Sequence, residues 1–401
     1  MGCNNLETMS VKKIAIVDCN NFYVSCERLF NPKLHNKPTV VLSNNDGCVI
    51  ARSKEIKDLG VKMGAPLFKL DDSIKDNMIK FSSNYVLYGD ISDRISSALK
   101  RFTPALEIYS IDESFMDLSH IEHDDLIEYM TQIKSEIFRL TGIPVSVGVG
   151  PNKTIAKLMN KLSKKDESFN GVCSFFHHPY VDDIEIGEVW GIGNKFEKKL
   201  NSIGVKTVRQ FKELQPFVVR KMFTVVGLRT YMELKGDLIH RLQTKFKKPK
   251  VVTSSRSFGR PVWQLEAVKD SIATFLQDCC SKLKIESLKP RICIIFVTTN
   301  RFSDNYRVWS KKILLYKPSN DTQSIWNEIA CHFDEVPFRL WARAGVICYD
   351  LIDDDFHEET LFEEQYDYKP LPQLDSKMWM TRRDFLSPKF TTDWSDIPKL
   401  N

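Results

Sequence analysis

The first 165 residues alternate between short apolar blocks and stretches with helical spacing. The apolar blocks predict strands at Ile14 to Asp18, Lys37 to Leu42, Cys48 to Arg52, Ala105 to Tyr109, Ser114 to Leu118 and Pro144 to Gly150. The stretches between them predict helices at Ser53 to Leu59, Tyr88 to Phe102, Asp124 to Leu140 and from Pro151 onward. Strands that alternate with helices indicate an α/β or α+β domain.

After Lys165 the pattern changes to shorter helical segments. Two similar turns, Trp190-Gly191-Ile192-Gly193 and Ser202-Ile203-Gly204-Val205, lie between helix-like stretches. This repeat resembles a helix-hairpin-helix, whose backbone amides hold nucleic-acid phosphates without reading sequence. A turn that serves only packing explains the same residues equally well.

A second mixed unit follows a basic segment. Arg241 to Lys250 contains five basic residues and a proline, as expected of an exposed linker that can lie along phosphates. Beyond it, a separate small domain is predicted, with helices at Val268 to Ile285 and Ser324 to Phe333 and strands at Arg291 to Thr298, Arg307 to Leu315 and Ala342 to Tyr349.

Composition narrows the class of protein. The 401 residues are 42% hydrophobic and 27% charged, as in globular proteins, and no apolar run is long enough to cross a bilayer. Met1 to Ser10 lacks the apolar stretch of a secretory signal, so a cytoplasmic protein is expected. The ten cysteines include no Cys-x-x-Cys pair, which predicts reduced thiols.

Charge is distributed unevenly along the chain. The formal net charge is +5, but the residues from Asp350 onward carry 13 acids and 6 bases, a net −7, so the first 349 residues carry +12. A basic body favours a polyanionic partner through counterion release, although charge alone does not identify the polyanion.

Three carboxylates stand at the ends of predicted strands. Asp112 and Glu113 occupy the turn of the hairpin formed by residues 105–118, and Asp18 ends the first strand. Adjacent acids in a turn are most often solvated surface residues. If the three meet, however, they offer the oxygen ligands that Mg²⁺ prefers and the core of two-metal phosphoryl transfer.

Four ordered stretches give the chain a family resemblance. They are Asp18-Cys19-Asn20-Asn21-Phe22-Tyr23-Val24-Ser25-Cys26-Glu27, Ser43 to Arg52, Gly60-Val61-Lys62-Met63-Gly64 and Ser110-Ile111-Asp112-Glu113. In order and spacing they resemble the Y-family translesion DNA polymerases, and most of all the UmuC branch. The resemblance covers essentially the whole chain and includes Trp379 to Arg382 and Ser387 to Trp394 near the C-terminus.

The resemblance implies an α+β multidomain, right-hand polymerase fold. Its parts would be a palm (11–30 and 80–166), fingers (31–79), a helical thumb with the helix-hairpin-helix (167–240), a basic linker (241–250), an α/β little finger (251–349) and an acidic tail or extension (350–401). Small residues in the fingers, Gly47, Ala51, Gly60 and Gly64, imply little shape checking of the nascent base pair. The implied activity is error-prone translesion DNA synthesis in the SOS response, with primer–template DNA and deoxynucleoside triphosphates as substrates.

The resemblance also assigns roles to the acids. Asp18, Asp112 and Glu113 would be the catalytic carboxylates, and together with the carbonyl of Cys19 they would hold two Mg²⁺ ions. Losing Asp112 should then abolish catalysis and leave the fold intact.

Roles in nucleotide binding follow in the same way. Tyr23 would be the steric gate that rejects a 2′-hydroxyl, with Phe22 beside it, although an aromatic after a strand is ordinarily core. Lys57 and Lys157 would contact the triphosphate, and Arg52 would lie near the nascent base pair or the phosphates. A lysine supplies a point charge and cannot form the bidentate fork of an arginine.

Accessory partners are implied near the C-terminus. Glu358-Glu359-Thr360-Leu361-Phe362 resembles a sliding-clamp peptide but lacks the usual leading glutamine. The branch also implies a UmuD-like accessory protein and a recombinase filament.

Two other functions share parts of this pattern. A nucleotide cyclase has a palm with paired carboxylates but needs no thumb or second DNA-gripping domain. A catalytically inactive DNA-binding relative would have lost one of the three carboxylates, and this chain retains all three.

Overall fold

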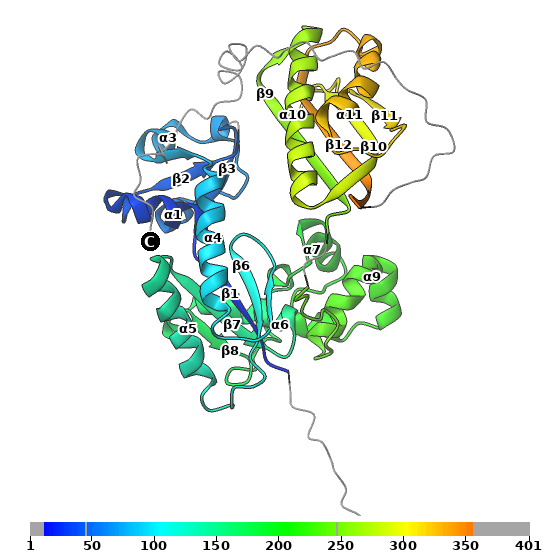
Figure 1. Cartoon of the computed structure of the whole chain (residues 1–401). Coiled ribbons are helices and arrows are strands. Elements are labelled where there is room, and N and C mark those ends of the chain that lie inside the picture. The colour runs from blue at the N-terminus through cyan, green and yellow to red at the C-terminus, as the bar shows by residue number, and fades with distance from the viewer. Residues whose placement is uncertain (1–11, 45, 246–247, 356–401) are drawn as a thin grey trace, which may run out of the picture.

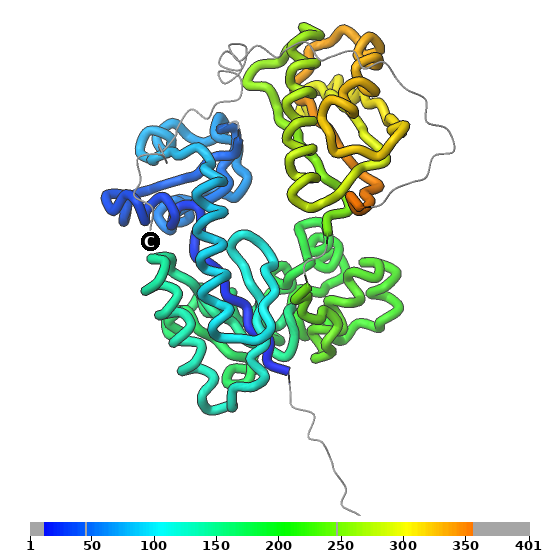
Figure 2. The backbone as a smooth tube through the Cα atoms, in the orientation of Figure 1, coloured from blue at the N-terminus to red at the C-terminus, as the bar shows by residue number. Residues whose placement is uncertain are grey.

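The computed structural model describes residues 12–44, 46–245 and 248–355. Four units follow one another and can be traced by colour in Figures 1 and 2. We call them the central unit (residues 12–30 and 83–174), the small-sheet unit (31–82), the helical unit (186–234) and the C-terminal unit (251–355). No helix in these described ranges is long and apolar enough to span a membrane.

The central unit is built on a five-stranded sheet in the order β5-β6-β1-β7-β8. Its strands are β1 Ile14–Cys19, β5 Leu106–Ile108, β6 Glu113–Asp117, β7 Val145–Gly150 and β8 Val172–Ser174. Strand β1 lies between β6 and β7 and is antiparallel to both, whereas β7 and β8 are parallel. Since helices cover both faces of the sheet, Ile14 to Val17 form a continuous apolar run and are all buried.

Four helices complete this unit: α1 Phe22–Phe30, α4 Tyr85–Leu99, α5 Leu126–Thr141 and α6 Lys153–Lys165. Helices α4 and α5 share a core with one face of the sheet, and α6 packs on the other through Ala156. Asn152 caps α6 by accepting a hydrogen bond from the amide of Ile155 at 3.0 Å. Gly148 on β7 lets α6 approach, because a Cβ there would lie 2.1 Å from the amide nitrogen of Asn160. Sequence reasoning missed α1.

The small-sheet unit has three strands in the order β3-β2-β4. They are β2 Thr39–Leu42, β3 Val49–Arg52 and β4 Ile79–Ser82, accompanied by the helices α2 Lys54–Asp58 and α3 Asp72–Asn77 and the 3₁₀ turns Pro32–Leu34 and Leu67–Lys69. Ser53 caps α2 by accepting from the amide of Ile56 at 3.4 Å. This cap begins the helix that carries Lys57, directly after the strand that ends at Arg52.

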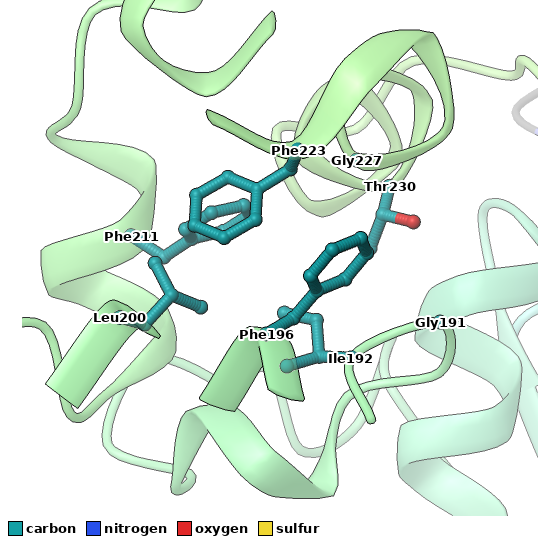
Figure 3. Close-up of a pocket in the computed structure, with 8 residues that line it drawn as sticks. All are labelled: Gly191, Ile192, Phe196, Leu200, Phe211, Phe223, Gly227 and Thr230. Carbon is teal, nitrogen blue, oxygen red and sulfur yellow. The ribbon is translucent and has the colours of Figure 1, made fainter. Parts of the chain in front are cut away.

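The helical unit contains α7 Asn194–Asn201, α8 Val208–Lys212 and α9 Pro216–Leu234, preceded by the 3₁₀ turns Glu167–Phe169 and Ile186–Glu188. Gly191 and Gly204 have φ of +88° and +83°, so the two repeated turns lie on either side of α7 in a conformation that favours glycine. Figure 3 shows the interior of this unit, where an apolar pocket is lined by Ile192, Leu200 and the rings of Phe196, Phe211 and Phe223. The lining is core packing, so this pocket is not the candidate site.

The C-terminal unit has a four-stranded antiparallel sheet in the order β11-β10-β12-β9. Its elements are β9 Val251–Val262, α10 Leu265–Ile285, β10 Leu288–Thr298, β11 Val308–Leu314, α11 Thr322–Ile329, the 3₁₀ segment Ala330–Glu335 and β12 Trp341–Asp353. Sequence reasoning missed β9, and β12 runs four residues past the predicted end at Tyr349. Nine cysteines lie in the described ranges, and none of them forms a disulfide.

An anchor segment, Leu238 to Gln243, fastens the chain between the helical and C-terminal units onto the central unit. Leu238 and Leu242 pack against the buried residues of the sheet face that also carries α6. The amide of Gln243 donates to Glu107 on β5 at 2.6 Å. The same carboxylate accepts two hydrogen bonds, at 2.6 and 2.7 Å, from Lys153 at the start of α6.

Candidate active site

The ends of β1 and β6 bring the three predicted carboxylates together along the backbone. Asp18 stands directly opposite Glu113 in the antiparallel register, and the amide of Cys19 donates to the carbonyl of Asp112 at 2.9 Å. Directly opposed residues of such a pair have Cβ atoms about 5 Å apart. Residues separated by more than ninety positions therefore meet because β1 pairs with the hairpin strand.

Ser110 shapes the turn that presents Asp112 and Glu113. Its hydroxyl accepts from the amide of Glu113 at 3.1 Å and donates to a carboxylate oxygen of Asp112 at 2.6 Å. The amides of Tyr109 and Ser110 both donate to the carbonyl of Glu113, at 3.0 and 3.1 Å. Sequence reasoning did not single out Ser110, although a serine two residues before an acid in a turn is a usual sign of such hydrogen bonding.

Two of the acids are paired with lysines of α6. Lys157 donates to both oxygens of Glu113 at 2.8 and 2.9 Å, and Lys164 lies 2.5 Å from Asp18. In the described part of the chain, no three acidic, histidine or cysteine side chains are arranged as a ready metal cluster. The backbone gathers the acids, while the side chains of Asp18 and Glu113 are directed at ammonium groups.

The pKa values at the site reflect burial and crowding of like charges. Burial raises the pKa of Asp18 above its ordinary value, and nearby Glu113 and Asp112 raise it further, against the lowering effect of Lys164. Burial also raises the pKa of the Cys19 thiol, which therefore stays protonated at neutral pH.

Three cations from two different units gather near Asp18: Lys164 pairs with it, and Lys57 lies near both Asp18 and Arg52. Burial lowers the pKa of Lys57 on α2, and its neighbours Arg52 and Lys164 lower it further, while Asp18 acts in the opposite direction. Arg52 donates to the carbonyl of Val61 at 2.5 Å, and its buried Nε has no hydrogen-bond partner among the described residues. The structure thus brings together the predicted Arg52 and Lys57 and adds Lys164, which sequence reasoning missed.

Lys157 lies beside three aromatic rings. Its ammonium lies 4.7 Å from the ring centre of Tyr109, 5.8 Å from that of Phe115 and 5.3 Å from that of Trp190. Trp190 belongs to the turn before α7, so the helical unit contributes to this cage. The three rings and the two hydrogen bonds hold Lys157 beside Glu113.

Tyr23 and Phe22 begin α1 directly after the site. Phe22 is buried in the core of the central unit, and Tyr23 is half-buried. The Tyr23 ring stacks on Tyr88 of α4, with centroids 4.3 Å apart and planes 14° apart, and the Tyr88 hydroxyl donates to buried Glu27 at 2.7 Å. Burial, with smaller effects of Tyr85 and Asp112, raises the pKa of Tyr23 to about 12. The ring is therefore held rigidly near the acids.

The donor chemistry of the site fits a hard divalent cation. Three neighbouring carboxylates are the kind of oxygen-rich group that such ions bind, and burial, with a smaller contribution from Glu113 and Asp112, raises the pKa of Asp18.

Comparison with known proteins places this site in a family. Residues 17–161 match the impB/mucB/samB family, residues 249–361 match its C-terminal domain, and residues 372–400 match a domain of unknown function. The chain is 33% identical to protein UmuC of Salmonella typhimurium over 96% of this chain and 99% of that protein. It is 34% identical to protein SamB of Salmonella typhimurium over 96% and 98%, respectively.

Solved structures share the fold. A Y-family DNA polymerase chimera, Dbh-Dpo4(243-245)-Dbh, superposes with a TM-score of 0.68 at 22% identity and covers 85% of this chain and 99% of its own. The architecture is therefore that of a Y-family polymerase, and the predicted α+β right-hand fold is confirmed.

Within that class, the chain belongs to the impB/mucB/samB family, the UmuC branch of the Y-family. Membership makes it a DNA-directed DNA polymerase and sets aside the nucleotide cyclase. The predicted clamp residues Leu361 and Phe362 lie outside the described residues.

Proposed function

We propose that this polymerase performs error-prone translesion synthesis in DNA damage tolerance, including SOS mutagenesis, by two-metal nucleotidyl transfer. The observation that supports the proposal most directly is the meeting of Asp18, Asp112 and Glu113 at adjoining strand ends, opposite the cations Arg52, Lys57 and Lys164. Clustered acids and clustered cations in one site suit a reaction between a metal-dependent nucleophile and a polyphosphate.

Asp18, Asp112, Glu113 and the carbonyl of Cys19 would hold two Mg²⁺ ions. Bound Mg²⁺ would supply charge to activate the primer 3′-hydroxyl and to stabilise the departing pyrophosphate. Ser110 keeps the Asp112 carboxylate oriented through its 2.6 Å hydrogen bond. Lys157 orients Glu113 from the aromatic cage, which makes it a positioning residue instead of the phosphate ligand expected for it.

The nucleotide would lie between the small-sheet and central units. Lys57 and Lys164 would contact its phosphates, and Arg52 would lie beside them or the nascent base pair. Tyr23 would lie under the sugar and exclude a 2′-hydroxyl, with buried Phe22 supporting it from the core.

The units correspond to the parts of a right hand. The central unit would be the palm, the small-sheet unit the fingers, the helical unit the thumb and the C-terminal unit the little finger. The turns at Gly191 and Gly204 would hold backbone phosphates of the DNA, and the exposed basic residues Lys245, Lys248 and Lys250 would lie along the duplex.

Primer extension across an abasic template site, with Mg²⁺ and single deoxynucleotides, tests this function. The wild type should extend the primer, and Asp112→Ala should lose extension by about a thousandfold or more while keeping the circular dichroism spectrum of the wild type. Asp124→Ala is the matched control, because that carboxylate is fully exposed and pairs with the surface residue His123. Equal extension by wild type and Asp112→Ala would show that a contaminant, and not this site, does the synthesis.

Accessory interactions form a separate part of the proposal. We further propose, from the resemblance to the UmuC branch, a cytoplasmic location, a UmuD-like partner, a recombinase filament and a sliding clamp bound through Leu361 and Phe362. Deleting Leu361-Phe362 should abolish stimulation of synthesis by the clamp and leave synthesis without the clamp unchanged. Unaltered stimulation would exclude this peptide as the clamp ligand.

A further inference from the structure

Helix α6 presents one lysine to each of three neighbouring strands. The lysines are four and seven residues apart, so they lie along one face of the helix. The pairs are Lys153 with Glu107 on β5, Lys157 with Glu113 on β6 and Lys164 with Asp18 on β1.

These three lysines differ in how firmly they are held. The side chain of Lys153 is 5% exposed and that of Lys157 is 14% exposed, and each donates two hydrogen bonds to its carboxylate. Lys157 is also enclosed by three rings. Lys164 is 32% exposed, and its contact to Asp18 is to one oxygen. Of the three, Lys164 is the lysine best able to leave its acid.

The cations near Lys164 indicate which group it would contact after leaving Asp18. Burial lowers the pKa of Lys57, and the charges of its neighbours Arg52 and Lys164 lower it further. Arg52 also has a buried, unpartnered Nε among the described residues. Several crowded cations are stabilised by a polyanion that contacts all of them, and a triphosphate is such a group.

We propose that Lys164 is an exchangeable counter-ion that couples binding of the metal to binding of the nucleotide. It neutralises Asp18 in the free protein and leaves that carboxylate for the phosphates when a metal-bound nucleotide enters. A divalent ion by itself competes with the Lys164 ammonium for Asp18 and binds weakly. The metal–nucleotide complex brings a metal ion for Asp18 and phosphates for Lys164. This inference rests on the proposed function, and it adds that the site binds a metal-bound nucleotide in preference to a metal ion alone.

The coupling is reciprocal. Phosphates that take Lys164 free Asp18 for the metal ion, and a metal ion that takes Asp18 frees Lys164 for the phosphates. Lys157 does not take part, because its cage and its two hydrogen bonds keep it on Glu113. The enzyme without nucleotide therefore binds metal ions weakly.

Manganese binding measured by electron paramagnetic resonance tests the proposal on the full chain at pH 8 without DNA. Lys164→Met should bind Mn²⁺ roughly tenfold more tightly than the wild type, the size expected for removing one charge-assisted competitor. Lys165→Met is the matched control: it loses the same charge from the same helix, but Lys165 pairs with Glu188 at 2.9 Å, away from the acids. Its Mn²⁺ affinity should equal that of the wild type.

The second measurement adds a saturating non-hydrolysable deoxynucleoside α,β-imidotriphosphate. The nucleotide should tighten Mn²⁺ binding at the protein site in the wild type and in Lys165→Met, and this gain should shrink at least about fivefold in Lys164→Met. Equal or weaker Mn²⁺ binding by Lys164→Met, or an unchanged gain, overturns the proposal.

Asp18→Asn distinguishes an error in the proposed coupling from an error in the proposed metal site. If it loses both Mn²⁺ binding and primer extension while Lys164→Met binds Mn²⁺ no more tightly, only the coupling is wrong. If Asp18→Asn keeps both, the metal site itself is misplaced and the proposed function fails with it.

Discussion

Replacing Glu107 with glutamine should destabilise the central unit strongly. The carboxylate is the counter-charge of Lys153, whose side chain is 5% exposed, and it also accepts the amide of Gln243. Glutamine retains the shape and one acceptor but leaves an ammonium buried over the ring of Phe115, 4.9 Å from its centre, with no opposite charge at that position. The substitution therefore removes the charge and also turns one acceptor oxygen into a donor that faces another donor.

The expected cost is about 3–5 kcal/mol, because removing one partner of a buried ion pair leaves the desolvation of the other uncompensated. A change of that size corresponds to a fall of roughly 13–21 °C in the melting temperature of a unit of this length. Replacing both partners, as Glu107→Gln with Lys153→Met, should recover most of the loss, since no charge then remains buried.

Urea unfolding followed by circular dichroism measures the loss, and hydrogen exchange shows whether it is located in β5, β6 and the anchor segment. The exposed pair Arg139 and Glu136 gives the control, for which Glu136→Gln should change stability little. If Glu107→Gln is no more harmful than this control, or if the double variant is as unstable as the sum of the single ones, the pair does not stabilise the unit as reasoned here.

Three further predictions concern the site itself. Tyr23→Ala should admit ribonucleotides about a hundredfold more readily in single-nucleotide primer extension, and unchanged sugar discrimination would refute the gate assignment. Tyr88→Leu removes the ring that stacks at 4.3 Å on Tyr23 and should relax sugar discrimination partly, whereas Tyr88→Phe keeps the ring and should retain it; equal behaviour of the two variants would show that stacking is unimportant. Because burial raises the pKa of Asp18 in the folded chain, its ionised form lowers stability above that pKa, so Asp18→Asn should be more stable than the wild type at pH 8. This advantage should shrink as the pH of thermal unfolding is lowered towards 5, and a constant difference would contradict the assigned cause.

The sequence was sufficient to predict the sheet strands that carry the acids. Ile14 to Val17 and the two arms around Ser110 to Glu113 are apolar blocks with clear ends, so their strands and the positions of the three carboxylates followed from pattern alone. Pairing of β1 with β6, which makes the carboxylates meet, is a tertiary property that only the family resemblance suggested.

Elements whose local preferences oppose their final structure were missed. Helix α1 begins with Phe22, Tyr23 and Val24, residues that favour strands, after an Asn21 with φ of 51°. Strand β9 contains Gly259 and Pro261 and many polar residues, and it is held by its pairing with β12.

Lys164 was not predicted as a site residue because its local sequence suggests a surface position. It lies among Lys161 and Lys165, and such a run of charge usually marks a solvated helix face. Extending the predicted helix beyond Lys157 by two turns would have placed Lys164 on the same face as Lys153, and that periodicity was the available signal. The position along β1 at which α6 crosses it decides which of the three lysines reaches Asp18. That position depends on tertiary packing and cannot be predicted from a local sequence pattern.

The hydrogen bond from Gln243 to Glu107 also sets how far the C-terminal unit can travel. Between Gln243 and Val251 there are seven residues, a tether that spans at most about 25 Å when fully extended. Releasing the six residues from Leu238 to Gln243 would lengthen that tether to about 45 Å. The carboxylate of Glu107, together with the packing of Leu238 and Leu242, thus limits the distance that the C-terminal unit can move from the central unit.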